Sequence, residues 1–338
     1  MISRERVFAA LNHREGDRVP LYIWTFGNPI EGPICEKYGG LREFFDAWDL
    51  DMIQSFPGAG MLAERPVSED MPDISDSAGL PSKLNAYGSV LTLEEALDAP
   101  FRDPSSRDIY DPIARDVSYH RDFRGRAIFV QTPGVFESTN GLLGLQGTLE
   151  YMATDPDKLG ELFIKIANWA AAYAEYCIDV GADVIHISDD WGRNDAMLFS
   201  PATWHKIVGP AEAITAQRVR GRGAYVSLHC DGYFWPVAAE LPSMGIQCVH
   251  PVQQSAGMDM ARFKREFGQK LCIYGGLDVR TTLGTGDLDL IRAEVRERMA
   301  QLKPGGGYIF CTSHMVQPGT TLEEVEVALE TAHESAKY

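Results

Sequence analysis

The alternation of short apolar runs with helical stretches is the feature that most constrains the fold of this chain. Eight runs have the length and the β-branched or aromatic content of buried strands: residues 19–26, 51–56, 126–131, 182–188, 225–229, 246–250, 271–274 and 308–311. Such alternation implies parallel strands with right-handed crossovers, and eight units of this kind close on themselves. We therefore expect residues 1–338 to form a single (β/α)₈ TIM barrel. A doubly wound open sheet is the alternative, but no GxGxxG follows an early strand.

The alternation is interrupted once, between residues 57 and 125. This segment is rich in Pro, Gly, Asp and Ser, as in the run EDMPD at residues 69–73. Long irregular segments inside a compact domain are usually lids or subdomains. We predict that residues 57–125 form an insertion after the second strand that acts as a lid over the barrel mouth. A second irregular stretch, a glycine-rich loop through Gly147, is expected after the third strand.

Composition and charge indicate which kinds of partner the protein can bind and in which cellular compartment it is expected. The net charge of −17 should repel nucleic acid and anionic membranes, and no apolar run is long enough to span a bilayer. The chain starts with an amphipathic helix pattern, so we expect a cytoplasmic protein. None of the six cysteines forms a CxxC pair. The oligomeric state stays open, a homo-oligomer included.

Polar side chains stand where several predicted strands end. Because side chains alternate between the two faces of a strand, Ser227, His229 and Asp231 share one side and Cys230 faces the other. The same parity groups three residues at the end of the preceding strand, namely His186, Ser188 and Asp190. The carboxyl ends of barrel strands carry the active sites of TIM-barrel enzymes, so we expect these groups to face the mouth.

One interpretation of these residues is a metal site made by His229, Asp231 and His314. Two imidazoles and a carboxylate would hold Zn²⁺ or Fe²⁺ with an open coordination position. The alternative is that the three residues hydrogen-bond to one another and to a substrate without a metal. Cys311 is a further candidate zinc ligand, although a buried structural cysteine is the preferred interpretation.

Other strand-end residues are candidates for catalysis and substrate binding. Asp189 and Asp190, together with His229, are the candidate catalytic groups, because a carboxyl group there can act as a general acid or base. The candidate substrate contacts are Trp24, Gln131, His186, Gln253 and Asp278.

At these residues the chain resembles the uroporphyrinogen decarboxylase superfamily. The likeness runs almost from end to end, through the segments RVFAALN (6–12), DRVP (17–20), SDDWG (188–192), HCDG (229–232), HPVQ (250–253), GGLD (275–278) and GGGYI (305–309). The resemblance implies the same barrel fold that the alternation predicts.

The superfamily, as the resemblance implies, contains two kinds of chemistry. True uroporphyrinogen decarboxylases use no cofactor and carry an RQAGR-like segment after the first strand, where this chain reads WTFGN at 24–28 without an arginine. Corrinoid-dependent methyltransferases bind zinc through a His-x-Cys motif and a later Cys. Here His229 matches the histidine, while Asp231 and His314 stand where the two cysteines belong.

A set of His, Asp and His is harder than a thiolate set and suits an oxygen substrate better than a sulfur one. The chain is therefore most similar to the O-demethylase-like members. This implies a methyltransferase that moves a methyl group from a small methoxylated compound, such as a methoxylated aromatic, to the cobalt of a corrinoid protein, with zinc as the candidate metal. A cofactor-free decarboxylase or lyase acting on a different carboxylic acid is the alternative, and a ligand-binding barrel without catalysis is a third.

Overall fold

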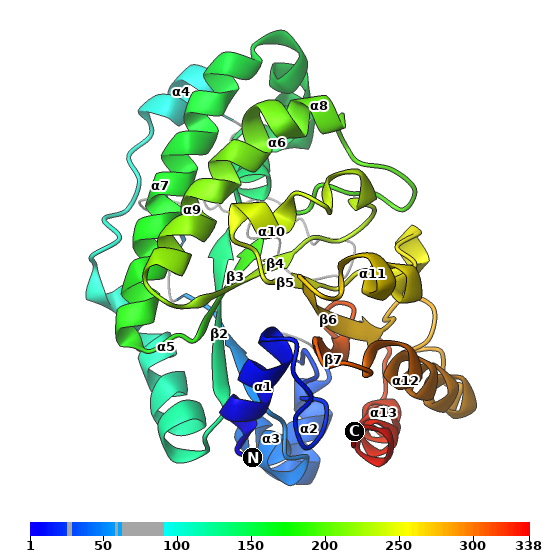
Figure 1. Cartoon of the computed structure of the whole chain (residues 1–338). Helices are drawn as coiled ribbons and strands as arrows, with labels where there is room; N and C mark the ends of the chain where they lie inside the picture. Colours follow the sequence, from blue (N-terminus) through cyan, green and yellow to red (C-terminus); the bar gives the residue numbers. More distant parts are fainter. Residues whose placement is uncertain (26–28, 58–59, 63–90) are drawn as a thin grey trace.

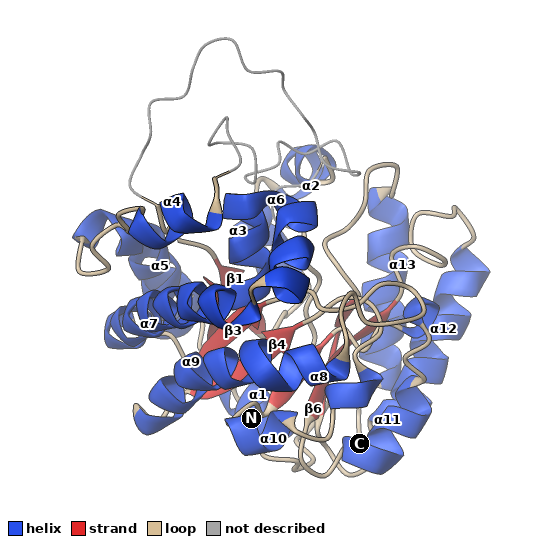
Figure 2. Cartoon of the chain, turned by 90° about the horizontal axis from the view of Figure 1, so that it is seen from above, coloured by secondary structure: helices blue, strands red, loops and turns tan. Residues whose placement is uncertain are grey.

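Seven parallel strands form one curled sheet with helices around its outside (Figures 1 and 2). The computed structural model describes residues 1–25, 29–57, 60–62 and 91–338. Neighbours in the chain are neighbours in the sheet, which is ordered β1 (Met52–Ser55), β2 (Ala127–Pro133), β3 (Val184–Ser188), β4 (Tyr225–His229), β5 (Cys248–His250), β6 (Cys272–Leu277) and β7 (Tyr308–Thr312). This sequential parallel order is that of a TIM-barrel-like fold.

The first predicted strand, residues 19–26, is where the eight-strand prediction was wrong. The described part of this segment makes only an isolated parallel bridge between Leu21 and Phe310. It nevertheless contacts both edges of the sheet. Phe310 N donates to Pro20 O at 2.9 Å, and Asp51 N donates to Leu21 O at 2.9 Å. The strand stays rudimentary because Pro20 has no N–H and Leu21 N donates to the Asp51 side chain instead, at 2.7 Å.

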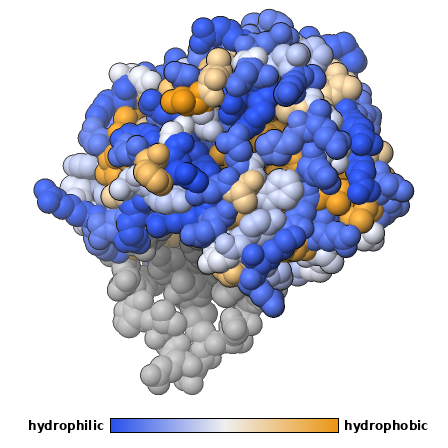
Figure 3. All heavy atoms as spheres, turned by 90° about the horizontal axis from the view of Figure 1, so that it is seen from below, coloured by the Kyte–Doolittle hydropathy of each residue, from blue (hydrophilic) through white to orange (hydrophobic). Residues whose placement is uncertain are grey.

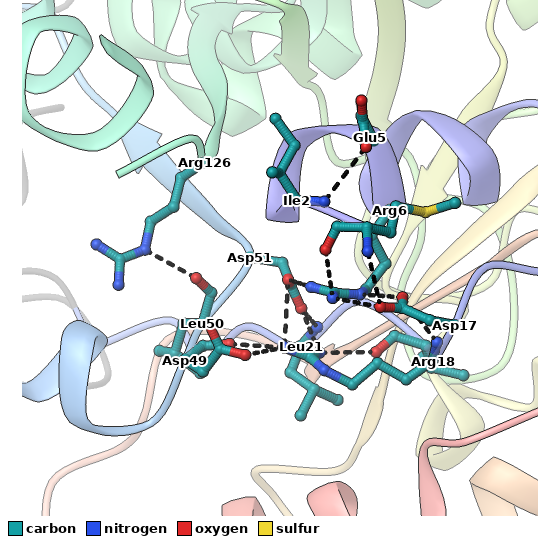
Figure 4. A network of polar contacts seen from close by, with 12 residues as sticks. Ile2, Glu5, Arg6, Asp17, Arg18, Leu21, Asp49, Leu50, Asp51 and Arg126 are labelled. Atoms are coloured by element: carbon teal, nitrogen blue, oxygen red, sulfur yellow. Dashed lines mark hydrogen bonds and ion pairs between the residues drawn. The ribbon is translucent and has the colours of Figure 1, made fainter. Parts of the chain in front are cut away.

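A buried carboxylate, Asp51, fastens this extended segment to the start of β1 (Figure 4). It accepts hydrogen bonds from the guanidinium groups of Arg6 and Arg18 as well as from Leu21 N. Arg6 also pairs with Asp17, at 2.7 Å. The network lies at the amino-terminal end of the strands, opposite the end where the polar strand-end residues gather.

The helices form the outer layer. Among the helices that the structure describes, α7 (Pro156–Val180) is the longest, and its ends follow from its sequence: the Asp155 side chain accepts from Lys158 N, Pro156 is the first residue, and Gly181 follows the last. The other helices of this layer are α1 (Ser3–Leu11), α2 (Glu31–Tyr38), α3 (Leu41–Ala47), α6 (Val135–Thr154), α8 (Pro201–Thr203), η4 (Trp204–Val208), α9 (Gly209–Gly221), η5 (Trp235–Val237), α10 (Leu241–Met244), η6 (Gln254–Ala256), α11 (Met260–Phe267), α12 (Leu288–Leu302) and α13 (Leu322–Ser335).

The predicted insertion, residues 57–125, falls partly outside the described residues. Its described portion from residue 91 onward is mainly helical, with α4 (Leu93–Asp98), η2 (Arg107–Tyr110), α5 (Asp111–Asp116) and η3 (Val117–Phe123). α4 packs against α7, and α5 packs against β1, so these helices belong to the outer layer. A lid formed by residues 57–125 stays a prediction.

The glycine-rich loop predicted through Gly147 was also wrong, because α6 occupies this stretch. The helix is kinked at Gly144, where φ is 74°. Its first N–H groups donate to carboxylates of other elements: Val135 N to Glu212 at 2.6 Å, and Glu137 N to Asp189 at 2.7 Å. These caps come from residues distant in the chain, so the local sequence does not reveal them.

The surface is mainly hydrophilic on the face seen from below, with small separated apolar areas (Figure 3). This agrees with 48 acidic against 31 basic residues in the chain. Within the described ranges, no helix has both the length and the apolar character required to cross a bilayer.

Candidate functional site

Histidines from β3, β4 and β5 meet inside the curl of the sheet. The strand register pairs His186 with Ser227 and His229 with His250, and paired residues of parallel strands point to the same side. Accordingly, His186 Nδ1 lies 2.9 Å from Ser227 Oγ, and His229 Nδ1 lies 2.8 Å from His250 Nδ1. The prediction that His186 on β3, and Ser227 and His229 on β4, point to the inside of the sheet is confirmed.

Cys230 faces away from the histidines, also as predicted. Its sulfur is buried and accepts a hydrogen bond from Trp191 N at 3.3 Å. Burial raises the pKa of the Cys230 thiol well above its usual range, so the group is a neutral packing residue.

The three predicted metal ligands, His229, Asp231 and His314, lie together at the carboxyl ends of β4 and β7. One ligand atom from each falls within 4.8 Å of the other two. His229 Nε2 is 3.8 Å from Asp231 Oδ1, and His314 Nε2 is 3.9 Å from Asp231 Oδ2. Ligand atoms on one tetrahedral zinc ion are about 3.4 Å apart, given bonds of about 2.1 Å. Small side-chain movements would therefore suffice to close the set around an ion.

Asp231 Oδ1 supports the same interpretation independently of these distances. The atom is buried and has no hydrogen-bond partner among the residues that the structure describes. An unsatisfied buried carboxylate oxygen costs free energy, which a bound cation would recover. Two nitrogen donors and one oxygen donor fit a divalent ion of borderline hardness, such as zinc or iron(II).

A second histidine group, His186, His229 and His250, overlaps the first and is more deeply buried. It shares His229, whose Nδ1 is already bonded to His250. His186, predicted to contact substrate, is in this deeper layer and not at the mouth. Burial lowers the pKa of His229 to about 3, and it lowers the pKa of His186 and of His250 well below their usual range. All three rings are therefore neutral at physiological pH.

Asp190 joins the site from the loop after β3. Its Oδ1 accepts a hydrogen bond from Asp231 N at 2.6 Å and lies 3.7 Å from His229 Nε2. Burial raises the pKa of Asp190, and it raises the pKa of Asp231 well above its usual range, with repulsion from Asp190 adding to the effect on Asp231. Both carboxyl groups are partly buried and still reach the mouth, because their side chains are 31% and 28% exposed.

Glu137 is a site residue that the sequence reading missed. It lies in the first turn of α6 and accepts a hydrogen bond from Ser188 Oγ at 3.0 Å. Burial, and then repulsion from Asp190 and Asp189, raises the pKa of Glu137 well above its usual range. Its segment was expected to be a loop, so no strand-end pattern pointed to it. The available signal was an acidic residue shortly after the end of a predicted strand.

Asp189, predicted to be catalytic, points to the opposite side of its strand end from Asp190. Its two oxygens accept from Phe136 N at 3.2 Å, Glu137 N at 2.7 Å and the Trp191 indole N–H at 2.6 Å. The structure thus places Asp189 at the amino terminus of α6, where it holds Glu137 in position.

The remaining predicted substrate contacts are spread around the cluster. Trp24 forms one wall, with its ring centroid 5.0 Å from that of His314 and 5.7 Å from that of His229. Gln131 accepts a hydrogen bond from Gln54 at 2.9 Å, on the same side of the sheet as His186.

Gln253 and Asp278 shape the loops around the mouth. Gln253 Oε1 accepts from Gly232 N at 3.1 Å and so supports the loop that carries Asp231. Asp278 Oδ1 accepts from Arg280 N at 2.7 Å, and its Oδ2 is buried without a hydrogen-bond partner among the described residues.

Two glycines allow the loops that carry Asp190 and Asp231 to touch. A Cβ on Gly192 would lie 2.3 Å from Tyr233 N, and a Cβ on Gly232 would lie 2.5 Å from the Gly192 carbonyl carbon. Gly232 also has a φ of 78°, which favours glycine. This close approach brings Asp231 N to the Asp190 carboxylate, so both glycines are part of the site's construction.

Comparison with known proteins identifies sequence relatives of this fold. The family model described as Uroporphyrinogen decarboxylase (URO-D) matches residues 139–335, which is more than half of the chain. The uroporphyrinogen decarboxylase of Vesicomyosocius okutanii is 26% identical over 204 residues, covering 56% of this chain and 53% of the relative. That of Synechocystis is 28% identical over 186 residues, covering 53% and 49%. The chain thus spans about half the length of these curated relatives.

Among solved structures, a methyltransferase from Methanosarcina mazei has the same fold over 99% of both chains. The TM-score is 0.72 and the sequence identity is 17%. The agreement in fold extends beyond the part of the chain that the family model matches.

Proposed function

This chain belongs to the uroporphyrinogen decarboxylase (URO-D) family, and from this premise we propose that it is a methyltransferase that moves a methyl group from a small methoxylated compound to a corrinoid protein. The convergence of His229, Asp231 and His314 is the observation that carries the proposal. The likeness of the whole fold to the Methanosarcina mazei methyltransferase supports it.

The donor set favours an oxygen-bound methyl group over a sulfur-bound one. His229, Asp231 and His314 would hold a divalent ion, and among the described residues no cysteine sulfur joins them. A bound ion of this kind supplies Lewis acidity to an ether oxygen. A thiol substrate would instead be served best by softer, thiolate-rich ligands.

Carboxyl groups of this chain would supply the proton to the leaving oxygen. When the bond between the methyl carbon and oxygen breaks, its electron pair stays on oxygen, which then needs a proton because an alkoxide or phenoxide leaves poorly. Asp190 lies 3.7 Å from His229 Nε2, beside the proposed ion. Burial raises the pKa of Asp190, so this group can hold a proton closer to neutral pH than an ordinary aspartic acid. Glu137, hydrogen-bonded to Ser188 behind it, is the second acid of the site.

The charge around the cluster argues against uroporphyrinogen as the substrate. Three carboxyl groups, those of Glu137, Asp190 and Asp231, face one another. Asp278 adds repulsion at Asp231, and Arg280 offsets part of it. A substrate with several carboxylates would be repelled by whichever of these groups are ionised, and it would disfavour their ionisation further. A neutral methyl ether meets no such barrier.

Decarboxylation of a different, smaller acid is the second candidate. The observation that favours it is that the curated relatives are uroporphyrinogen decarboxylases. The two candidates differ in what they need, because methyl transfer requires an acceptor corrinoid and decarboxylation does not.

The test is to incubate zinc- or iron-loaded protein with reduced free corrinoid and a panel of methyl ethers, following the absorption spectrum of the methylated corrinoid. We expect methylation with the native protein, a loss of at least 100-fold with His314→Ala, and no loss with His205→Ala, which replaces an exposed histidine of η4. Release of carbon dioxide from a carboxylic acid, with no methylation across the panel, would establish the decarboxylase instead.

A further inference from the structure

His250 is buried beside the proposed metal ligand His229 but is not a member of the set formed by His229, Asp231 and His314. Both of its ring nitrogens are engaged. Nε2 lies 3.0 Å from the backbone carbonyl oxygen of Thr312, and Nδ1 lies 2.8 Å from His229 Nδ1.

The Thr312 carbonyl determines where the protons of both rings lie. A carbonyl oxygen only accepts, so the hydrogen bond to it requires the proton of His250 on Nε2. A neutral imidazole carries one N–H, which leaves Nδ1 of His250 as an acceptor. His229 must then donate from its own Nδ1, and its Nε2 is left with a lone pair.

That lone pair is directed to the carboxylates. His229 Nε2 is 3.7 Å from Asp190 Oδ1 and 3.8 Å from Asp231 Oδ1. Without an acceptor at Nδ1, the proton of the ring would be drawn to Nε2, because an N–H there could donate to either carboxylate. An Nε2–H cannot bind a metal ion.

We propose that His250 is a positioning residue. It donates from Nε2 to the Thr312 carbonyl and accepts at Nδ1 from His229, which keeps Nε2 of His229 deprotonated and available to a cation. The same hydrogen bond fixes the orientation of the His229 ring. Outer hydrogen bonds of this kind typically change metal affinity by 10- to 100-fold. This role rests on the proposed cation site, but the hydrogen-bond direction can be tested without any metal.

The surroundings of His250 offer a matched control. The ring of Tyr274 packs against His250, with centroids 4.5 Å apart, and also lies 5.8 Å from His186. Replacing Tyr274 by Phe keeps this packing and leaves the hydrogen bonds of His250 to Thr312 and His229 in place. His250→Gln keeps one donor and one acceptor at the position, whereas His250→Phe removes both.

The first measurement is long-range ¹H–¹⁵N NMR of the metal-free native protein with labelled histidine, which reports the protonated nitrogen of each neutral ring. We expect His229 to carry its proton on Nδ1 and His250 on Nε2. A proton on Nε2 of His229 in the native protein would overturn the inference. This measurement needs no variant, so a folding defect cannot obscure it.

The second measurement is the affinity for Zn²⁺ by competition with a chromophoric chelator. We expect His250→Phe to lose 10- to 100-fold and to shift the His229 proton to Nε2, with His250→Gln recovering most of the affinity and Tyr274→Phe retaining both native values. An unchanged His229 tautomer in folded His250→Phe would also overturn the inference. If the tautomers are as expected but the native protein binds no metal, the proposed role of His250 in fixing the His229 tautomer is supported and the proposed function fails.

Discussion

Replacing Asp51 by Ala tests how the extended segment is joined to the sheet. Asp51 is fully buried, and the side chains of its partners Arg6 and Arg18 are only 7% and 11% exposed. The substitution leaves two nearly buried guanidinium groups short of a carboxylate and removes the acceptor of Leu21 N. At the start of β1 the segment would then be held chiefly by the backbone hydrogen bond from residue 51 N to Leu21 O.

The expected cost is about 3–5 kcal/mol of the free energy of unfolding. Breaking a buried ion pair by removing one partner costs about that much. Arg6 and Arg18 each keep a second carboxylate, Asp17 and Asp49, which reduces the penalty. The unsatisfied Leu21 N–H adds about 1–3 kcal/mol. Since domains are stable by about 5–15 kcal/mol, the change should be large but measurable.

Urea unfolding followed by circular dichroism would measure it, with Asp49→Asn as the control, because Asp49 has a φ of 44°, which Asn tolerates better than Ala. Asp49 pairs with the same Arg18, but its side chain is 71% exposed, so its loss should cost less than about 1 kcal/mol. The slopes of the two unfolding curves should agree, so that a shift in midpoint reports stability alone. If Asp51→Ala and Asp49→Asn differ by less than about 1 kcal/mol, the buried network does not stabilise the junction.

Three further predictions address the site and the pH dependence. Gly192→Ala should weaken zinc binding at least tenfold in calorimetry, because a Cβ there would lie 2.3 Å from Tyr233 N, whereas Gly221→Ala, with no atom within 4 Å of its Cβ, should bind as the native protein does. His229→Ala should abolish methyl transfer in the corrinoid assay while Cys230→Ser retains most of it, and the reverse ranking would refute the assigned strand register. Burial, with the nearby charge of Arg126, lowers the pKa of His120 in the folded protein to about 3. Below about pH 6.5 the His120 side chain is therefore protonated in the unfolded chain but not in the folded one, so the free energy of unfolding falls as the pH drops. Between pH 6.5 and pH 5, native protein should lose about 1–2 kcal/mol more than His120→Gln in urea unfolding, and equal losses would show that His120 does not contribute to the acid sensitivity.

Most of the sheet and the inward-facing half of the site could be predicted from residue type and spacing. Seven of the eight predicted strands are present, because runs of apolar residues between helices form strands largely from local preference and burial. Strand parity depends only on the alternation of side chains, so the shared side of Ser227 and His229, and the outward turn of Cys230, followed from residue spacing. The spatial meeting of His229, Asp231 and His314 followed from parallel strands presenting their carboxyl ends at one mouth.

The features that could not be predicted depend on contacts between residues far apart in the chain. Residues through Gly147 form α6 and not a loop, because Asp189 and Glu212, from elements 52 and 77 residues away, accept the first N–H groups of the helix. This cap places Glu137 in the site and engages Asp189, whose neighbour Asp190 faces His229. The first predicted strand is reduced to a single bridge because the buried Asp51 side chain accepts the N–H of Leu21. The proton position of His229 depends on a backbone carbonyl of β7, relayed through His250. Hydrogen-bond direction between distant groups is set by their three-dimensional arrangement, which residue spacing along one strand does not encode.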